Sequence, residues 1–596
     1  MGKFQLKDIW SNPSLLTAIR KFSFWLSFIT AIILIYDVGF DQTPSLNQSL
    51  KDFYFLVLFI GIPSILIRYF AQKEKLGLKV KIFDTILFIL FSLILIIHID
   101  FIWKLLPLPD FFNKMAWVYL ALSLYFIREL SVININFDRD YLNPAQLFIS
   151  SFIFIILAGT ALLLLPNATH AGISLLDALF TATSAVCVTG LIVVDTGSYF
   201  TEFGQIIILI LIQLGGLGIM TFASYFSYFF RGKTSYENQL MLKDITNSEK
   251  IGEVFNVLKK IILLTFAIEL IGGVFIFLSL EKSVIPEFGE RLFFSVFHTV
   301  SGFCNAGFST LQHSLYEPAF RFNYPLQLII SVLFILGGLG FPIIFNLSKY
   351  LKYLVKNKVL RIKQGERALH DPWVININTR IVIITSIILT SVGTVIFYVF
   401  EYNNTLAGHS SLGKVVSAFF SASTPRTAGF NVVETSGLHF STIMMIFFLM
   451  WVGASPVSTG GGIKTSTIAI ATFNFFSLAR GKDRIEIYKR EIAQISIRRA
   501  FSIISLSLAV IGMAIFMIAA FDSDKSLLSI AFECFSAYST VGLSLGITSN
   551  LSSASKLVLI CTMFIGRVSM LTILIALLRR VKHLNYQYPK EEILIN

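Results

Sequence analysis

Long apolar runs bounded by lysine or arginine restrict the fold of this chain more than any other feature. The first four cover residues 22–36, 53–70, 82–97 and 115–127. Their lengths approach the roughly 20 residues that an α-helix needs to cross a bilayer. With 55% hydrophobic and 14% charged residues, the composition is too apolar for a water-soluble domain. The pattern predicts an all-α integral membrane protein and not a β-barrel, whose strands would alternate apolar and polar residues.

The positive charge lies between the apolar runs and indicates which loops face the cytoplasm. A net charge of +13 fits the positive-inside bias of membrane proteins better than it fits nucleic-acid binding. Four basic residues precede the first run, and no small-residue cleavage site follows it, so we expect a retained helix with a cytoplasmic N-terminus. Arg579, Arg580 and Lys582 follow the last run and place the C-terminus on the same side.

A motif of the form F-x3-S-x5-G-[LF] occurs four times after residue 145. Its glycines are Gly190, Gly307, Gly429 and Gly542, which are 117, 122 and 113 residues apart. Each lies in a short apolar segment between two long apolar runs, and basic loops separate the four units. If all of these loops are cytoplasmic, each unit has two full spans and a middle segment that enters the membrane and returns. The glycines could also serve close helix packing, but their fixed spacing from phenylalanine and serine favours a shared function.

Backbone without regular hydrogen bonds is tolerated at membrane depth only where protein buries it or where it lines an aqueous path. Four such segments around one axis could turn their carbonyl oxygens inward and replace the water shell of an ion. The fourth segment shares Thr-Val-Gly with the potassium-channel filter TVGYG. We therefore predict a potassium site at the four glycines. The candidate filter residues are Val188, Thr189 and Gly190; Asn305, Ala306 and Gly307; Thr427, Ala428 and Gly429; and Thr540, Val541 and Gly542.

The last apolar run of the third unit contains a concentration of helix breakers. These are Gly453, Pro456, Gly460, Gly461 and Gly462. A flexible loop inside the membrane is expected there, obstructing the path below the filter. The stretch 458–466 is not a nucleotide-binding P-loop, because Ile463 separates the last glycine from Lys464.

Two intramembrane cations are candidates for gating, because charges at such depth usually face a cavity or a partner. Lys464 either lies near the path or extends to the interface, and Arg567 either acts in gating or forms an ion pair with Glu269. Arg426 is expected near the outer mouth, in a hydrogen-bonded structural role at least as much as in ion screening.

These residues resemble the TrkH/KtrB/HKT superfamily of potassium transporters. The likeness covers residues 145–582 and rests on SAVCVTGL at 184–191, RTAGFN at 426–431, the stretch 455–465 and Ile-Gly-Arg at 565–567. It implies four helix–pore loop–helix (M1-P-M2) units around one pore, with filter glycines at the four positions above. It also implies a gating loop that includes Lys464, and a fourth-unit arginine at Arg567. A homodimer and a separate cytosolic, nucleotide-binding RCK-type subunit are implied by the resemblance alone. Because Ser569 and Met570 replace the small residue and proline expected after Arg567, we expect a straighter helix there than in relatives.

The predicted organisation has six parts. They are a four-helix membrane domain at 1–135, pore units at 140–232, 245–350, 375–482 and 495–582, and a short cytoplasmic tail at 583–596. The first part is additional to the family core and has a faint likeness to voltage-sensor domains. Its fourth helix carries one arginine, Arg128, where a sensor needs several, so a packing or regulatory role is the better interpretation.

The leading functional hypothesis is potassium-selective, channel-like uptake across the cytoplasmic (inner) membrane, driven by the membrane potential. A potassium/proton or potassium/sodium symporter, or a sodium-permeable member of the family, remains the alternative. Glycine at all four filter positions favours potassium, because some sodium-permeable members of the family that this chain resembles carry serine at the first of these positions. Potassium is expected as the substrate, and no cofactor is expected. An enzyme is not indicated, since the eight histidines include no HExxH motif.

Overall fold

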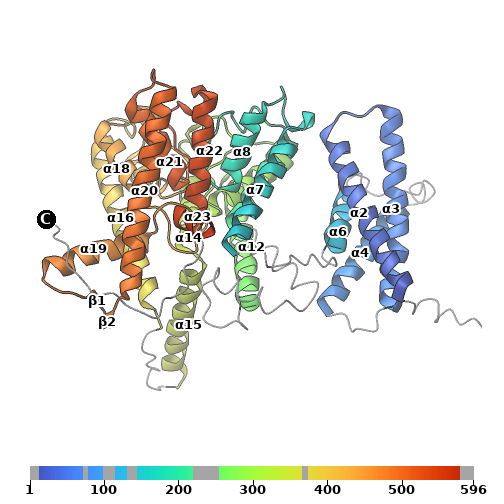
Figure 1. Cartoon of the computed structure of the whole chain (residues 1–596), viewed down its shortest axis with the longest axis horizontal. Helices are drawn as coiled ribbons and strands as arrows, with labels where there is room; N and C mark the ends of the chain where they lie inside the picture. Colours follow the sequence, from blue (N-terminus) through green and yellow to red (C-terminus); the bar gives the residue numbers. More distant parts are fainter. Residues whose placement is uncertain are drawn as a thin grey trace, which may run out of the picture.

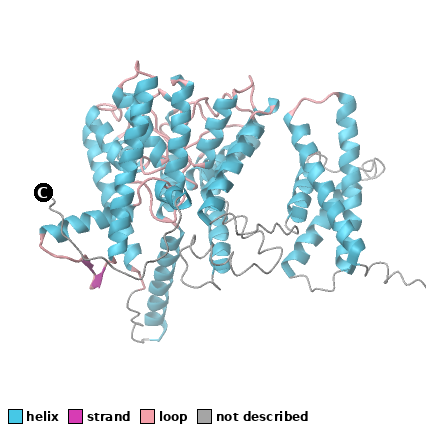
Figure 2. Cartoon of the chain, in the orientation of Figure 1, coloured by secondary structure: helices cyan, strands magenta, loops and turns pink. Residues whose placement is uncertain are grey.

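The computed structural model describes residues 13–71, 78–97, 115–130, 144–218, 254–364 and 374–577. These ranges are mostly helical, and the two strands within them, β1 (Glu486–Ile487) and β2 (Arg490–Glu491), form a short antiparallel pair (Figure 2). Five described helices are long and apolar enough to cross a membrane: Lys21–Gly39, Pro44–Ile67, Val257–Ser279, Ile377–Glu401 and Gln494–Phe521. The predictions for Arg579, Arg580 and Lys582, for the tail at 583–596 and for the basic loop between the first two units lie outside the described residues.

The first four described helices form a bundle that stands apart from the other helices in Figure 1. They are α2 (Pro13–Gly39), α3 (Pro44–Ala71), α4 (Leu78–Ile97) and α6 (Ala116–Leu130). The end of α2 meets the rest of the chain at the short helix η2 (Pro166–Ala168), where the Asn167 side chain donates to the carbonyl oxygen of Val38 at 3.2 Å.

Polar side chains join the helices inside this N-terminal bundle. Arg128 of α6 and Asp84 of α4 form a buried ion pair, with Nε 2.7 Å from Oδ1 and Nη2 3.1 Å from Oδ2. At the opposite end of α6, the hydroxyls of Tyr54 and Tyr119 both donate to Asp37 Oδ2, at 3.0 and 2.8 Å. A bidentate pair fixes two helices in one register, so Arg128 fixes α6 against α4 within the bundle.

Twelve of the remaining described helices form four groups, each with a long helix, a shorter helix and a further helix. The groups are α7 (Pro144–Leu163), α8 (Leu175–Val186) and α9 (Glu202–Leu217); α12 (Val254–Ser279), α13 (Phe288–Phe303) and α14 (Tyr324–Leu339); α16 (Ile377–Glu401), α17 (Ser411–Ser423) and α18 (Phe440–Trp451); and α20 (Gln494–Phe521), α21 (Leu527–Ser539) and α22 (Ser553–Val568). In each group the shorter helix packs against the helix before it.

The four groups are arranged in a closed ring. The last helix of each group packs against the shorter helix of the next: α9 on α13, α14 on α17, and α18 on α21. The ring closes because α22 of the fourth group packs on α8 of the first. The four short helices are therefore brought around one centre, although more than 100 residues separate each from the next.

Three of the final helices end at the same relative position. After α9, α14 and α22, the chain passes through Gly218, Gly340 and Ser569, with φ of 76°, 83° and 76°. At Gly340 the axis turns by 104° into α15 (Phe341–Gln364), and at Ser569 a new helix, α23 (Met570–Leu577), begins. The helix after Arg567 is thus interrupted and not continuous, because Ser569 adopts a backbone conformation normally reserved for glycine.

Candidate functional site

The carboxyl ends of the four short helices lead directly into the four glycine segments. The side chains of Ser174, Ser410 and Ser526 cap the amino ends of α8, α17 and α21 by accepting a backbone N–H. At the carboxyl ends, helix dipoles present partial negative charge. Four such ends around one centre favour a cation there.

Each glycine segment has the same alternating backbone. The residue two positions before the glycine is left-handed in all four, with φ of 56° at Val188, 62° at Asn305, 75° at Thr427 and 50° at Thr540. The glycines follow with φ of 86°, 71°, 80° and 91° in chain order. Non-glycine residues rarely adopt this conformation, and strain of this kind concentrates at ligand-binding positions.

The four glycines lie against one another in the order of the chain. A Cβ built on Gly307 would come within 2.9 Å of the carbonyl oxygen of Ala428. On Gly190, Gly429 and Gly542 it would overlap the carbonyl oxygens of Ala306, Val541 and Thr189, respectively. The structure thus brings the twelve candidate filter residues together at one point, and a side chain at a glycine position would collide with the neighbouring segment.

The backbone N–H groups of the segments point back toward their own helices. Those of Thr189, Ala306 and Val541 donate to the carbonyl oxygens of Ser184, Ser301 and Ser536 at 2.8–2.9 Å. The hydroxyls of Ser184 and Ser536 also accept from Gly190 and Gly542, at 3.1 and 3.0 Å. With the N–H groups held by the helix, the carbonyl oxygens remain available to a cation. This explains the serine six residues before the glycine in the first and fourth segments.

The third segment departs from the repeated motif by one residue. Ser423, six residues before Gly429, donates to Phe419 O within its own helix. Thr424 instead holds the segment, because its hydroxyl donates to Phe430 O at 2.7 Å, as Ser301 does to Phe308 O. The buried phenylalanine is Phe420, with no exposed surface, while Phe419 is partly exposed. In the third segment, the residues that bind and pack are therefore one position later than the sequence motif predicts.

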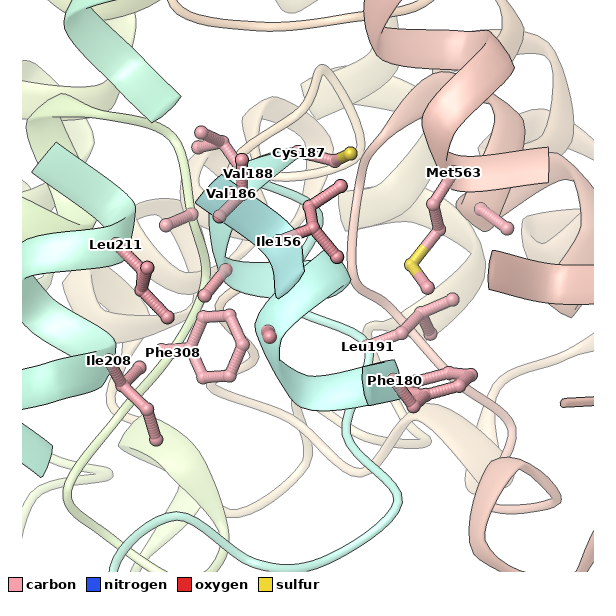
Figure 3. Close-up of a cluster of buried hydrophobic side chains, with 14 of the residues drawn as sticks. Ile156, Phe180, Val186, Cys187, Val188, Leu191, Ile208, Leu211, Phe308 and Met563 are labelled. Atoms are coloured by element: carbon pink, nitrogen blue, oxygen red, sulfur yellow. The ribbon is translucent and has the colours of Figure 1, made fainter. Parts of the chain in front are cut away.

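Large apolar side chains anchor the four glycine segments in the hydrophobic core. The residues after the four glycines, Leu191, Phe308, Phe430 and Leu543, are at most 5% exposed. Figure 3 shows the cluster around the first segment, where α7, α9, α22 and the second segment contribute side chains. Those labelled are Ile156, Phe180, Val186, Cys187, Val188, Leu191, Ile208, Leu211, Phe308 and Met563. Such packing prevents the segment from moving outward.

The glycine-rich stretch of the third group is a loop between α18 and α19 (Thr465–Ala479). It lies beside the ends of the glycine segments that are nearest to the short helices. A Cβ on Gly460 would overlap the hydroxyl of Thr427, and one on Gly461 that of Thr540. Thr459 donates to Phe303 O at 3.3 Å and lies 3.2 Å from the Asn305 side chain. The N–H groups of Ser455 and Thr459 donate to the carbonyls of Gly338 and Gly337. Glycine is thus required where the loop touches the third and fourth glycine segments.

Two cationic side chains hold this loop. Lys464 Nζ donates to the carbonyl oxygens of Gly460 and Gly461 at 2.7 and 3.4 Å. Arg567 donates from one nitrogen to Thr459 O and from another to Gly215 O at the end of α9. Within the described residues, Arg567 therefore binds backbone carbonyls and not Glu269, which accepts from Gln213 at 3.0 Å. The sequence did not indicate these carbonyl partners, because they are separated from Arg567 by 108 and 352 residues.

Arg426 stays away from the loop. Its guanidinium donates to Ser386 O, Ser386 Oγ and Thr390 Oγ1 on α16, at 3.4, 3.1 and 3.3 Å. These contacts anchor the third segment to the first helix of its own group, which is the structural role.

Comparison with known proteins agrees with this arrangement. A family model described as "TrkH: Cation transport protein" matches residues 119–586. The chain is 34% identical over 467 residues to the potassium/sodium uptake protein NtpJ of Enterococcus hirae, covering 77% of this chain and 98% of that protein. It is also 34% identical to the Ktr system potassium uptake protein B of Bacillus subtilis, covering 76% and 96%. The crystal structure of the potassium transporter TrkH from Vibrio parahaemolyticus matches with a TM-score of 0.58 and 17% identity, over 84% of this chain and 99% of that one.

Proposed function

The chain belongs to the TrkH family of cation transport proteins, and from this premise we propose that it is a potassium-selective, channel-like uptake protein. The family consists of membrane cation transporters and not of enzymes. Two relatives named for potassium uptake, each matched over almost its whole length, support potassium as the substrate. At 100 mV, inside negative, each entering cation gains about 2.3 kcal/mol, which supports roughly 50-fold accumulation without ATP.

The observation that carries the proposal is the meeting of the four glycine segments at the carboxyl ends of four helices. Their alternating left-handed residues turn successive carbonyls toward one side, while helix carbonyls hold the N–H groups. This geometry suits a dehydrated monovalent cation. We assign the ion site to Gly190, Gly307, Gly429 and Gly542, with the two preceding residues of each segment.

In the membrane, we propose that each group of three helices is one M1-P-M2 unit, with repeats over 140–232, 245–350, 375–482 and 495–582. The short apolar helices α8 and α21, at 12 and 13 residues, are too short to span a bilayer, which supports a re-entrant role. Both termini lie in the cytoplasm in this scheme, and the protein resides in the cytoplasmic membrane. The bundle of α2, α3, α4 and α6 is an added packing or regulatory domain.

Gating is assigned to the loop at 452–464 together with Lys464 and Arg567. Its contacts with Thr427 and Thr540 at one end of the filter support an obstruction that must move for ions to pass. A homodimer and a separate cytosolic nucleotide-binding subunit are part of the proposal. The relatives named as the B component of a Ktr system support a partner subunit, since a lettered component implies others.

Tracer rubidium uptake into proteoliposomes of the purified chain tests the proposed function. With an inside-negative potential, we expect uptake that external potassium suppresses at lower concentration than sodium does. Equal suppression by both ions would favour the sodium-permeable alternative. Uptake absent both alone and after addition of a Ktr-type regulatory subunit would contradict the proposal.

Symport with protons requires a titratable group near the path, and Glu269 is one buried carboxylate close to the second glycine segment. It lies on α12, is 8% exposed and accepts from Gln213, whose other side-chain atom lies 3.8 Å from Cys304 in the second segment. For a channel, we expect Glu269→Gln to retain potential-driven rubidium uptake within about twofold, since an amide can fill the same hydrogen-bonding site.

The measurement compares uptake driven by potential alone with uptake driven by an inward proton gradient at zero potential. Glu281→Gln, on the exposed turn after the same helix, is the matched control. Proton-driven uptake in the wild type that is lost in Glu269→Gln and kept in Glu281→Gln would replace the channel with a symporter.

A further inference from the structure

Two of the four short helices carry a buried titratable side chain that reaches beyond the filter glycine. In α13, His298 Nδ1 lies 2.9 Å from Phe294 O and Nε2 lies 2.8 Å from Ser309 Oγ. Because a carbonyl can only accept, Nδ1 carries the proton, and Nε2 of the neutral ring accepts from the Ser309 hydroxyl. Ser309 Oγ in turn accepts the N–H of Leu311 at 3.1 Å.

The fourth group repeats this arrangement with a different side chain. In α21, Glu533 Oε1 accepts from the Ser544 hydroxyl at 2.5 Å, and Ser544 Oγ accepts the N–H of Gly546 at 2.8 Å. Thr548 donates to the other carboxylate oxygen at 2.9 Å, and the Leu545 N–H donates to Oε1 at 3.3 Å. His298 and Glu533 are both fully buried.

The two sites share one arrangement, which we call the serine bridge. A helix side chain nine residues before the glycine accepts a hydrogen bond from a serine hydroxyl two residues after the glycine. The same serine oxygen accepts the backbone N–H four residues after the glycine. The other two groups lack it. Thr181, at the helix position in the first group, donates to Asp177 O in its own helix, and Asn431, at the serine position in the third, donates to Val433 O.

The bridged segments lie opposite each other. The glycines contact one another in the order first, second, third, fourth and back to first, so the second and fourth segments are not neighbours. The backbone that follows the glycine is therefore held by a serine bridge in the second and fourth segments. The first and third segments rely on apolar packing and on hydrogen bonds from their own helices.

We propose that His298 and Glu533 are positioning residues that set the cation preference of the filter through the two serine bridges. This inference rests on the proposed function. Selectivity between potassium and sodium depends on the geometry and field of the carbonyl oxygens, and the bridge fixes the backbone directly after Gly307 and Gly542. Loss of the serine frees that backbone to turn. In the second segment it also leaves the buried His298 Nε2 without its donor, whereas Glu533 Oε1 keeps the N–H of Leu545.

The test removes the serine in each bridge and compares it with an unbridged position in the same register. Ser309→Ala and Ser544→Ala are each expected to lower the ratio of half-inhibitory sodium to potassium concentrations, in rubidium uptake, by about fivefold. Asn431→Ala is the matched control, and we expect it to keep the wild-type ratio. A wild-type ratio in both serine variants, or an equal loss in Asn431→Ala, would overturn the proposal.

Variants on the helix side separate positioning from general support of the fold. Glu533→Gln keeps a carbonyl oxygen that can accept from Ser544, and we expect its ratio to stay within about twofold of wild type. Glu533→Leu has a similar volume but no acceptor, so its ratio is expected to fall as in Ser544→Ala. Equal ratios in Glu533→Gln and Glu533→Leu would contradict positioning by Glu533.

Thermal unfolding of the purified protein gives a readout that does not require flux. We expect wild type to unfold at a higher temperature in potassium chloride than in sodium chloride, and this difference to shrink in Ser309→Ala and Ser544→Ala but not in Asn431→Ala. If the wild type carries no rubidium either alone or with a Ktr-type regulatory subunit, the proposed function fails, and the thermal measurement alone tests the serine bridges. The same difference in unfolding temperature in all variants, or no difference in the wild type, would overturn the proposed role of the serine bridges.

Discussion

Replacement of Gly190, Gly429 or Gly542 by alanine is expected to lower the potassium preference of rubidium uptake by about tenfold or more. Each of these glycines is left-handed, which costs an L-residue about 1–2 kcal/mol. The new methyl group would also overlap a backbone carbonyl oxygen of the next segment, which cannot move aside without displacing the ion site. Uptake with competing potassium or sodium measures the loss.

The four positions should differ in a predictable order. At Gly307 the added Cβ would lie 2.9 Å from the nearest carbonyl oxygen, so Gly307→Ala should be the mildest of the four. Gly172→Ala is the matched control, because Gly172 has φ of 78° and no atom within 4 Å of a built Cβ. It carries the backbone strain without the collision. A loss in Gly172→Ala as large as in Gly190→Ala would mean that strain, and not the filter, explains the effect.

The sequence predicted the parts of the site that depend on local pattern. Glycine, serine and a following apolar residue recur at fixed spacing because each helix holds its own segment by short-range hydrogen bonds, such as Thr189 N–H to Ser184 O. The break after Trp451 was equally local, since glycine and proline disfavour helix wherever they stand. These features needed no knowledge of how the four groups meet.

The sequence failed where contacts are distant. Thr459 and Asn305 are 154 residues apart, and no spacing rule connects them. The register of the third segment was also missed, because a phenylalanine and a serine do precede Gly429 by the expected ten and six residues. Phe420 and Thr424 are used instead, since packing on the neighbouring helices decides which face of α17 is buried. The break at Ser569 was missed because serine seldom adopts a positive φ.

The second large effect concerns the cations that hold the loop at 452–464. Arg567→Met is expected to raise rubidium uptake by about tenfold, since it removes charge-assisted hydrogen bonds to Thr459 O and Gly215 O, each worth about 1.5–3 kcal/mol. The loop would then leave the filter more often. Lys464→Met removes the bond to Gly460 O and should act in the same direction. Uptake per reconstituted protein, at fixed potential, is the measurement.

Arg426→Met is the matched control for these two variants. Arg426 likewise donates to backbone and hydroxyl partners, but all of them are on α16 and none is on the loop. Its loss should not raise uptake. The potassium preference should stay at the wild-type ratio in Arg567→Met and Lys464→Met, because neither side chain touches a filter carbonyl in the described hydrogen bonds. Lower uptake in all three variants would instead mean that the cations only stabilise the fold, and the loop would then lose its role as a gate.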